Sequence, residues 1–178
     1  GVTNELISRL LFEYLLPENF YPNLTSRQAG GVFGANFKLA ILMNLVIQAF
    51  KYAAEPFFFK ESGNQNSPQL YARVMHAFII FCSLLMIAIS VNLFWIGPTF
   101  LRSSGYEAGL FMVPMLLMGY LLLGVYFNLS IWFKLTDQTS YSFWITFTGA
   151  VISISVIFLF VPKFGYLGGS LSTLACYL

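Results

Sequence analysis

Charged residues are scarce in this sequence. Of its 178 residues, 9% are charged and 58% are hydrophobic, whereas a typical soluble domain is about 25% charged. Nine Lys and Arg with seven Asp and Glu cannot cover the surface of a water-soluble globule of this length. The formal net charge of +2 is too small to indicate nucleic acid or another polyanion as a partner. The composition therefore excludes an ordinary soluble domain, a disordered chain and a nucleic-acid-binding chain.

Residues that build catalytic and metal sites are also few. His76 is the single histidine, and Cys82 and Cys176 both lie in apolar runs. One imidazole without a second His or a nearby Cys does not predict a metal site, and the two cysteines are typical of small packing residues rather than of a disulfide framework. The sequence has no phosphate-binding glycine loop, dinucleotide fingerprint, zinc-protease or serine-hydrolase motif. We therefore expect no catalytic residue, metal or cofactor, and no enzyme.

Apolar residues are arranged in long uninterrupted blocks. Runs of about twenty residues match the length that an α-helix needs to cross about 30 Å of hydrocarbon, and they lack the alternating ten-residue pattern of a transmembrane barrel. The sequence therefore predicts an all-α polytopic transmembrane bundle. The expected spans are residues 35–59, 74–96, 108–133, 141–161 and 165–178. The last run would rise only about 21 Å, too short to span, so we expect the sequence to be a piece of a longer protein.

The connectors between these spans hold most of the remaining charge. Two crossings separate connector 60–73 from connector 134–140, so we expect both to lie on the same side of the membrane. Lys and Arg are divided almost evenly between the two sides, and the positive-inside rule therefore assigns no orientation.

Residues 1–34 precede the first span. Glu5, Arg9 and Glu13 form a polar stripe at helical spacing in an otherwise apolar segment, which indicates an interfacial amphipathic helix or the frayed end of a preceding span. Residues 18–34 are rich in Pro, Asn, Ser and Gly, which predicts a loop.

The first span carries an unusual polar stripe. Asn44, Gln48, Lys51 and Glu55 fall within an arc of about 60° on a helix. Charges at the bilayer centre are costly and usually face a bundle interior or a wet cavity. One interpretation is the wall of a hydrophilic translocation cavity; the other places Lys51 and Glu55 near the interface, with the two amides bridging helices. Lys51 and Glu55 are spaced for an ion pair along the helix, and Pro56 after Glu55 predicts the end of the regular helix.

Small residues line one face of two other spans, which predicts close helix packing in lipid. The stripe of the fourth span consists of Ser142, Thr146, Gly149 and Ser153. The stripe of the last run consists of Gly165, Gly169, Ser172 and Cys176. Pro114, inside the third span, predicts a kink.

Four segments together resemble a known family in sequence and in order. They are GVTNELISRLL (1–11), GVFGANFKLAILMNLVIQAFKYAAEPFFF (31–59), VYFNLSIWFKLTDQTSYS (125–142) and VPKFGYLGGSLSTLACYL (161–178). The second is the most specific, because a Gly-rich entry leads into a span that ends in an aromatic-Ala-Glu-Pro-Phe cluster. The family is that of the bacterial polysaccharide-biosynthesis flippases of the multidrug/oligosaccharidyl-lipid/polysaccharide exporter superfamily.

The resemblance implies a multi-pass transporter of the bacterial inner (cytoplasmic) membrane that flips lipid-linked oligosaccharides, such as lipopolysaccharide precursors, by alternating access between two lobes. This chain would supply part of the C-terminal lobe, with an N-terminal lobe as its partner and connectors 60–73 and 134–140 in the cytoplasm. The stripe of Asn44, Gln48, Lys51 and Glu55 would then line the substrate cavity. Three alternatives remain: a cation-coupled multidrug exporter, which needs an acidic cation site; a polytopic membrane enzyme, which needs converging His and carboxylates; and a structural membrane subunit.

Overall fold

Helices are the regular structure in the part of the chain that this computed structural model describes, residues 10–17, 20–21, 24–61, 67–101, 104–136 and 138–177. No strand occurs among these residues. A short helix at residues 10–15 is followed by α2 (Ser26–Glu61), α3 (Ser67–Val91), α4 (Leu93–Leu101), the 3₁₀ helix η1 (Ser104–Met112), α5 (Val113–Leu135), α6 (Thr139–Phe164) and α7 (Tyr166–Tyr177).

Four helical segments are long and apolar enough to cross a membrane, judged by length and composition. They are Ser26–Glu61, Ser67–Val91, Gly105–Leu135 and Ser140–Phe164. The prediction of an all-α polytopic bundle is confirmed, and the chain has the character of a multi-pass membrane protein.

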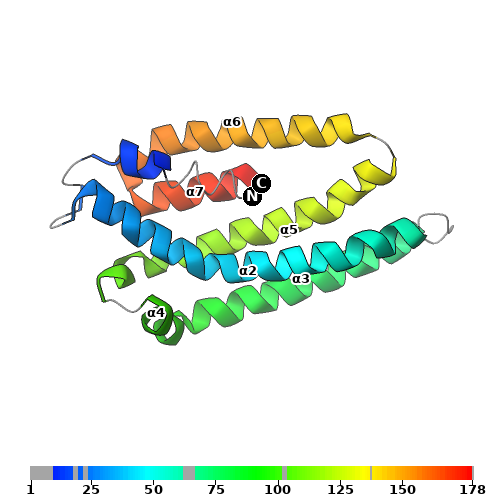
Figure 1. The fold of residues 1–178 in the computed structure, drawn as a ribbon, viewed down its shortest axis with the longest axis horizontal. Helices are drawn as coiled ribbons and strands as arrows, with labels where there is room; N and C mark the ends of the chain where they lie inside the picture. The colour runs from blue at the N-terminus through cyan, green and yellow to red at the C-terminus, as the bar shows by residue number, and fades with distance from the viewer. Residues whose placement is uncertain are drawn as a thin grey trace.

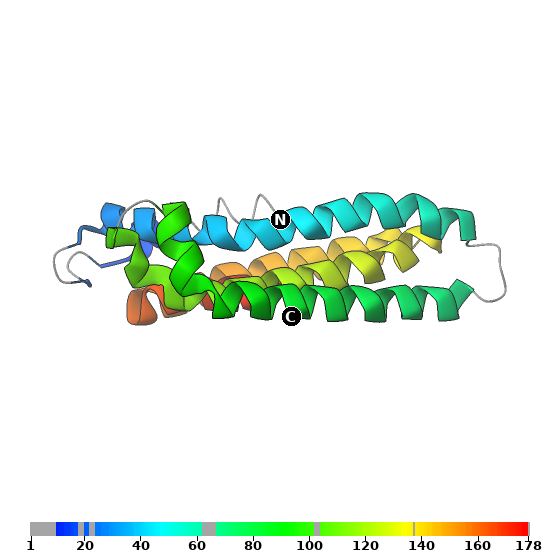
Figure 2. The same ribbon diagram turned by 90° about the horizontal axis from the view of Figure 1, so that it is seen from below.

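The long helices run side by side along the longest axis of the molecule (Figure 1). Seen from below, α2 and α3 lie along opposite edges of the bundle (Figure 2). Helix α5 packs against both. A Cβ atom at Gly124 of α5 would lie 2.7 Å from the Phe78 ring of α3 and 3.4 Å from the Ile47 side chain of α2. Helix α7 folds back along α6 and fills the space between α5 and α6 at one end of the bundle.

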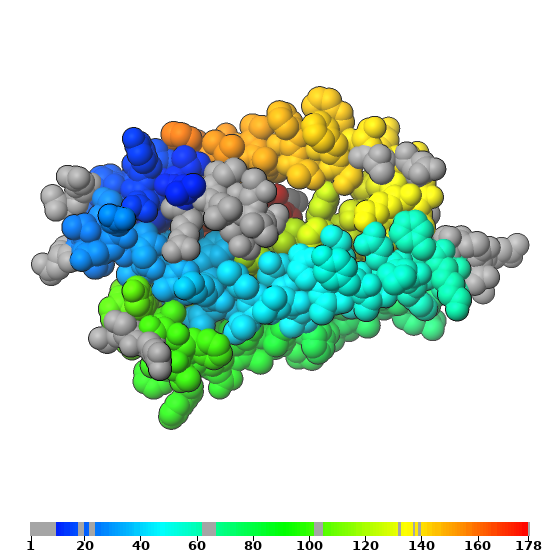
Figure 3. All heavy atoms as spheres, in the orientation of Figure 1, coloured from blue at the N-terminus to red at the C-terminus, as the bar shows by residue number. Residues whose placement is uncertain are grey.

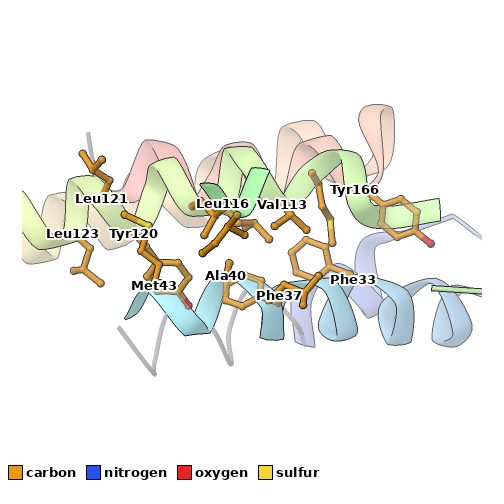
Figure 4. Close-up of a cluster of buried hydrophobic side chains, with 14 of the residues drawn as sticks. Phe33, Phe37, Ala40, Met43, Val113, Leu116, Tyr120, Leu121, Leu123 and Tyr166 are labelled. Carbon is orange, nitrogen blue, oxygen red and sulfur yellow. The ribbon is translucent and has the colours of Figure 1, made fainter. Parts of the chain in front are cut away.

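The core is built from the side chains that α2 and α5 turn toward each other. Phe33, Phe37, Ala40 and Met43 of α2 are buried against α5 (Figure 4). The facing side chains of α5 and α7 in the same cluster are Val113, Leu116, Tyr120, Leu121, Leu123 and Tyr166.

The α2–α3 and α5–α6 connections lie at the same end of the bundle (Figure 1). A small buried cluster joins these ends, with Phe58 of α2 packed near Tyr71 of α3 and Ile131 of α5. The helix ends that flank connectors 60–73 and 134–140 thus lie at one end of the bundle, and the side of the membrane that the connectors occupy stays a prediction.

The loop expected over residues 18–34 differs from the structure, because α2 begins at Ser26. The backbone N–H of Thr25 donates to Gln28 Oε1 at 2.9 Å, and the Gln28 N–H donates to Thr25 Oγ1 at 3.3 Å. This reciprocal pair is a capping box, a strong helix start signal. Of the glycines that suggested a loop, Gly30 serves packing: it is buried, and a Cβ there would lie 3.4 Å from Glu13 Cβ, whereas a Cβ at Gly31 would meet nothing within 4 Å.

The preceding helix lies on the bundle. Phe12 is fully buried, and its ring stacks on Phe33 of α2 at 4.6 Å between centroids. Glu13 Oε1 is 3.9 Å from Arg27 Nε. The other two residues of the expected amphipathic stripe, Glu5 and Arg9, lie outside the described residues.

Pro56 does not end the helix, contrary to the sequence prediction, and α2 continues to Glu61. A proline inside a helix removes one backbone hydrogen bond, at a cost of about 3 kcal/mol or more. Tertiary contacts hold the last turns in place: Phe58 is buried beside Ile131, and the Tyr71 hydroxyl donates to the Phe58 carbonyl oxygen at 2.9 Å.

Pro114, unlike Pro56, does not lie in a helix interior. The 3₁₀ helix η1 ends at Met112 and α5 begins at Val113, so Pro114 occupies the first turn of α5. A missing N–H costs no intrahelical hydrogen bond at that position. The predicted kink is thus replaced by a change of helix type.

Helices α6 and α7 are in close contact, but the two predicted small faces meet only in part. Gly149 of α6 meets the Cys176 backbone of α7, whereas Gly169 of α7 faces Phe33 of α2.

Helix α6 continues through Pro162 to Phe164, so the expected connector 162–164 is helical and the turn falls at Gly165. Gly165 has a positive φ of 54°, which glycine adopts at little cost. In α7, a Cβ at Gly168 would lie 2.5 Å from the Phe160 carbonyl oxygen of α6.

Candidate functional site

The predicted polar stripe of Asn44, Gln48, Lys51 and Glu55 lies along one flank of α2, and all four residues are half-buried. Gln48 Nε2 donates to Asn44 Oδ1 at 3.3 Å, so the two amides bond to each other along the helix. Among the described residues this bond runs along α2, whereas the interface interpretation has the two amides bridging helices.

Lys51 has an aromatic partner. Its Nζ lies 4.4 Å from the centroid of the Phe127 ring on α5 and 6.0 Å from that of Tyr52. A cation over a ring face at this distance is stabilised by about 0.5–2 kcal/mol. Among the described residues, the ion pairs are Arg27–Glu13 and Glu55–Lys134, and neither includes Lys51.

The expected ion pair between Lys51 and Glu55 is therefore wrong. Glu55 Oε1 instead pairs with Lys134 Nζ at the end of α5. Glu55 and Lys134 lie near helix ends that meet at the same end of the bundle. Glu55 therefore pairs with Lys134 of α5 rather than with Lys51, one turn away on its own helix. Lys134 could have been found from sequence, since it opens the connector expected beside the end of α2.

The stripe lies off the side of α2 that packs on α3, and Lys51 at its edge lines a narrow crevice with Phe78 of α3. Phe50 contacts Phe78 of α3, with 4.4 Å between ring centroids, and it is at least about 100° round the helix from every stripe residue. The stripe consequently borders the open side of α5, where Phe127 receives the Lys51 ammonium.

Asn128 is a polar neighbour of this region that the sequence did not single out. It lines a narrow crevice together with Lys51 and Phe127. Its Nδ2 donates to the Gly124 carbonyl oxygen at 3.0 Å, while its buried Oδ1 has no hydrogen-bond partner among the described residues. Spacing along α5 gives no signal for this residue, because its neighbours here come from α2.

A large apolar groove lies on the other side of Phe127, between α5, α6 and the end of α7. Its volume is about 930 Å³, and Figure 3 shows the surface hollowed over α5, between α2 and α6. We call it the α5–α6–α7 groove. Its lining includes Leu122, Tyr126, Phe127, Trp144, Ile152 and Cys176.

Tyr126 ties the two walls of this groove together. Its hydroxyl lies 2.9 Å from Ser142 Oγ and 2.9 Å from Thr146 Oγ1 of α6. Two members of the predicted small face of α6 thus bond to α5, while Gly149 and Ser153 contact Cys176 of α7.

This arrangement presents a half-buried cation without a carboxylate partner among the described residues, next to an apolar groove. Such a cation can bind an anionic group that has left water. Within the described part of the chain, no three His, Cys, Asp or Glu side chains converge to hold a metal ion. No protein-family model, curated protein or solved structure matches the chain.

Proposed function

We propose that this chain contributes to a transporter that flips lipid-linked oligosaccharides across the bacterial inner membrane by alternating access, with the stripe of α2 lining the route. The observation that carries the proposal is the position of Lys51. It is a half-buried cation in a membrane-length helix, and its partner among the described residues is the neutral ring of Phe127.

A lipid-linked oligosaccharide must bring a phosphate charge through the hydrocarbon region. An isolated charge there is very costly unless it is paired. Lys51 lies ten residues before the end of α2 at Glu61, which places it about 15 Å along the helix from that end. A cation along the route offsets part of the cost of moving the phosphate out of water.

The surrounding charges leave Lys51 available for this role. Glu55 is the nearest acidic residue along the helix, and its carboxylate is paired with Lys134. The charge of Glu55 is thus balanced by Lys134, and the charge of Lys51 is left over in this region. The resemblance of four ordered segments to polysaccharide flippases supports the same activity.

The test removes the charge of Lys51 in the full-length protein. Lys51→Ala should abolish export of surface glycan while the protein still reaches the membrane in normal amount, and Lys51→Arg should retain part of the activity. Lys38→Ala is the matched control, because Lys38 is an exposed lysine on the same helix. Normal export by Lys51→Ala would contradict the substrate role and leave the stripe structural.

A further inference from the structure

The 3₁₀ helix η1 is unusually long. It covers nine residues, Ser104–Met112, whereas 3₁₀ runs of more than three or four residues are uncommon because their hydrogen bonds have poorer geometry. It leads directly into α5, and the two together form one long apolar helical segment, Gly105–Leu135. A 3₁₀ stretch within a longer helical segment often marks a functional hinge.

Asn36 of α2 contacts η1 at two positions. Its side chain is fully buried, and its Nδ2 donates to the Val32 carbonyl oxygen of its own helix at 2.9 Å and to the Tyr106 carbonyl oxygen of η1 at 2.8 Å. A Cβ at Gly109 would lie 2.5 Å from the same Nδ2. The amide of Asn36 therefore lies against both position 106 and position 109 of η1.

These two contacts match the geometry of a 3₁₀ helix. With three residues per turn, residues i and i+3 lie one above the other, so Tyr106 and Gly109 share one face of η1. In an α-helix the same two residues would be about 60° apart. The Asn36 amide would then lose its fit to one of them.

We propose that η1 switches between a 3₁₀ and an α-helical form, and that Asn36 stabilises the 3₁₀ form. The inference is independent of the proposed function, because it does not involve Lys51 or any anion. Nine residues rise about 18 Å in a 3₁₀ helix and about 13.5 Å in an α-helix. Conversion would therefore draw α4 toward α5 by about 4–5 Å, at the end of the bundle opposite the α2–α3 connection (Figure 1).

Neither form of η1 is favoured by every contact. The 3₁₀ form leaves the buried Asn36 Oδ1 without a hydrogen-bond partner among the described residues, and an unpaired buried acceptor is costly. The α form would place Pro114 in a helix interior, but α2 and α6 continue through Pro56 and Pro162. The bond from Asn36 to η1 is therefore the contact whose removal should shift the balance.

A distance between two spin labels tests the switch. In the full-length protein, with its native cysteines replaced by alanine, the labels are attached to cysteines introduced at Glu107 and Leu129, which are both exposed. Residues 107–112 belong to η1 and the rest of the interval to α5. Conversion should shorten the distance along the helix axis by about 3 Å, as measured by double electron–electron resonance.

Asn36→Leu removes the bond to η1 at similar side-chain volume, and we expect the shorter distance to dominate in this variant. Asn92→Leu is the matched control. Asn92 Nδ2 also donates to the carbonyl oxygen four residues earlier, that of Ala88, at 2.8 Å, but it makes no bond to η1 among the described residues. Asn92→Leu should keep the parent distance, and a parent distance in folded Asn36→Leu would overturn the proposal.

Gly109→Ala disturbs the same contact from the side of η1. Its Cβ would displace the Asn36 amide, and we expect the same shortening with α2 unchanged in sequence. Gly31→Ala is its control, because a Cβ at Gly31 would meet nothing within 4 Å. If Asn36→Leu gives no folded protein, Gly109→Ala decides alone, and a parent distance in that variant rejects the switch.

Discussion

Gly149 of α6 and Cys176 of α7 are in such close contact that a Cβ on Gly149 would lie 2.7 Å from the Cys176 carbonyl oxygen. The obstacle is backbone, which cannot rotate away as a side chain can. The two helices are thus held at a separation that only glycine allows at this position.

Replacing Gly149 with leucine should force α6 and α7 apart. Overpacking usually costs about 1–3 kcal/mol, and a backbone obstacle puts this site at the upper end of that range. We expect a lower folded yield and a lower melting temperature in detergent. Ala150→Leu is the control, because Ala150 is the next residue and is exposed. Equal tolerance of both variants would argue against close α6–α7 packing.

The ion pair between Glu55 and Lys134 should be measurable by a double-mutant cycle. The side chains are 27% and 40% exposed, so screening limits the coupling energy to below about 1 kcal/mol. We expect Glu55→Gln and Lys134→Gln each to lower the melting temperature slightly, with the double variant no worse than either single one. Strictly additive losses would show that the two residues do not interact.

Phe127 should set the affinity of Lys51 for an anion by fixing the ammonium in place. Phe127→Leu removes a contact of about 0.5–2 kcal/mol, which corresponds to roughly a 2- to 30-fold weaker pyrophosphate binding. Phe127→Tyr keeps a ring and should bind nearly as well as the parent. The comparison variant is Phe81→Leu, at an exposed position of α3. Unchanged affinity in Phe127→Leu would mean that the ring does not position Lys51.

The shared end of the two connections predicts a labelling pattern in intact cells. Cysteines introduced at Gln69 and Gln138, both exposed, should react alike with an impermeant thiol reagent. A cysteine at the exposed Thr99 of α4, near the opposite end of the bundle (Figure 1), should show the opposite accessibility. Opposite labelling of positions 69 and 138 would place the two connections on different sides of the membrane.

The spans could be predicted from the sequence because length and hydropathy are local properties of a segment. The start of α2 is equally local, since Thr25 and Gln28 form its capping box, but the prediction of a loop over residues 18–34 used only the Pro, Asn, Ser and Gly content of that segment. The passage of α2 through Pro56 was not predictable in this way, because contacts with Tyr71 and Ile131 from other helices hold that turn.

In the candidate site, too, features local to one helix could be predicted and contacts between helices could not. Helical periodicity placed the stripe residues on one flank of α2, and the structure has them there. The partners of the two charged residues came from α5: Phe127 for Lys51 and Lys134 for Glu55. No spacing along a single helix reports which residue of another helix faces it, so the pairing of Lys51 with Glu55 was a reasonable but wrong expectation.

The contacts between α2 and α5 join these two helices into one rigid unit. One end is clamped by the Glu55–Lys134 pair, and the other by the packing of Phe37 against Tyr120, 6.1 Å between ring centroids. When such a rigid unit tilts, the distances between residues of its two helices stay the same. Lys51 and Phe127 would keep their separation during a tilt of the two helices. An anion bound at Lys51 would then move together with both helices.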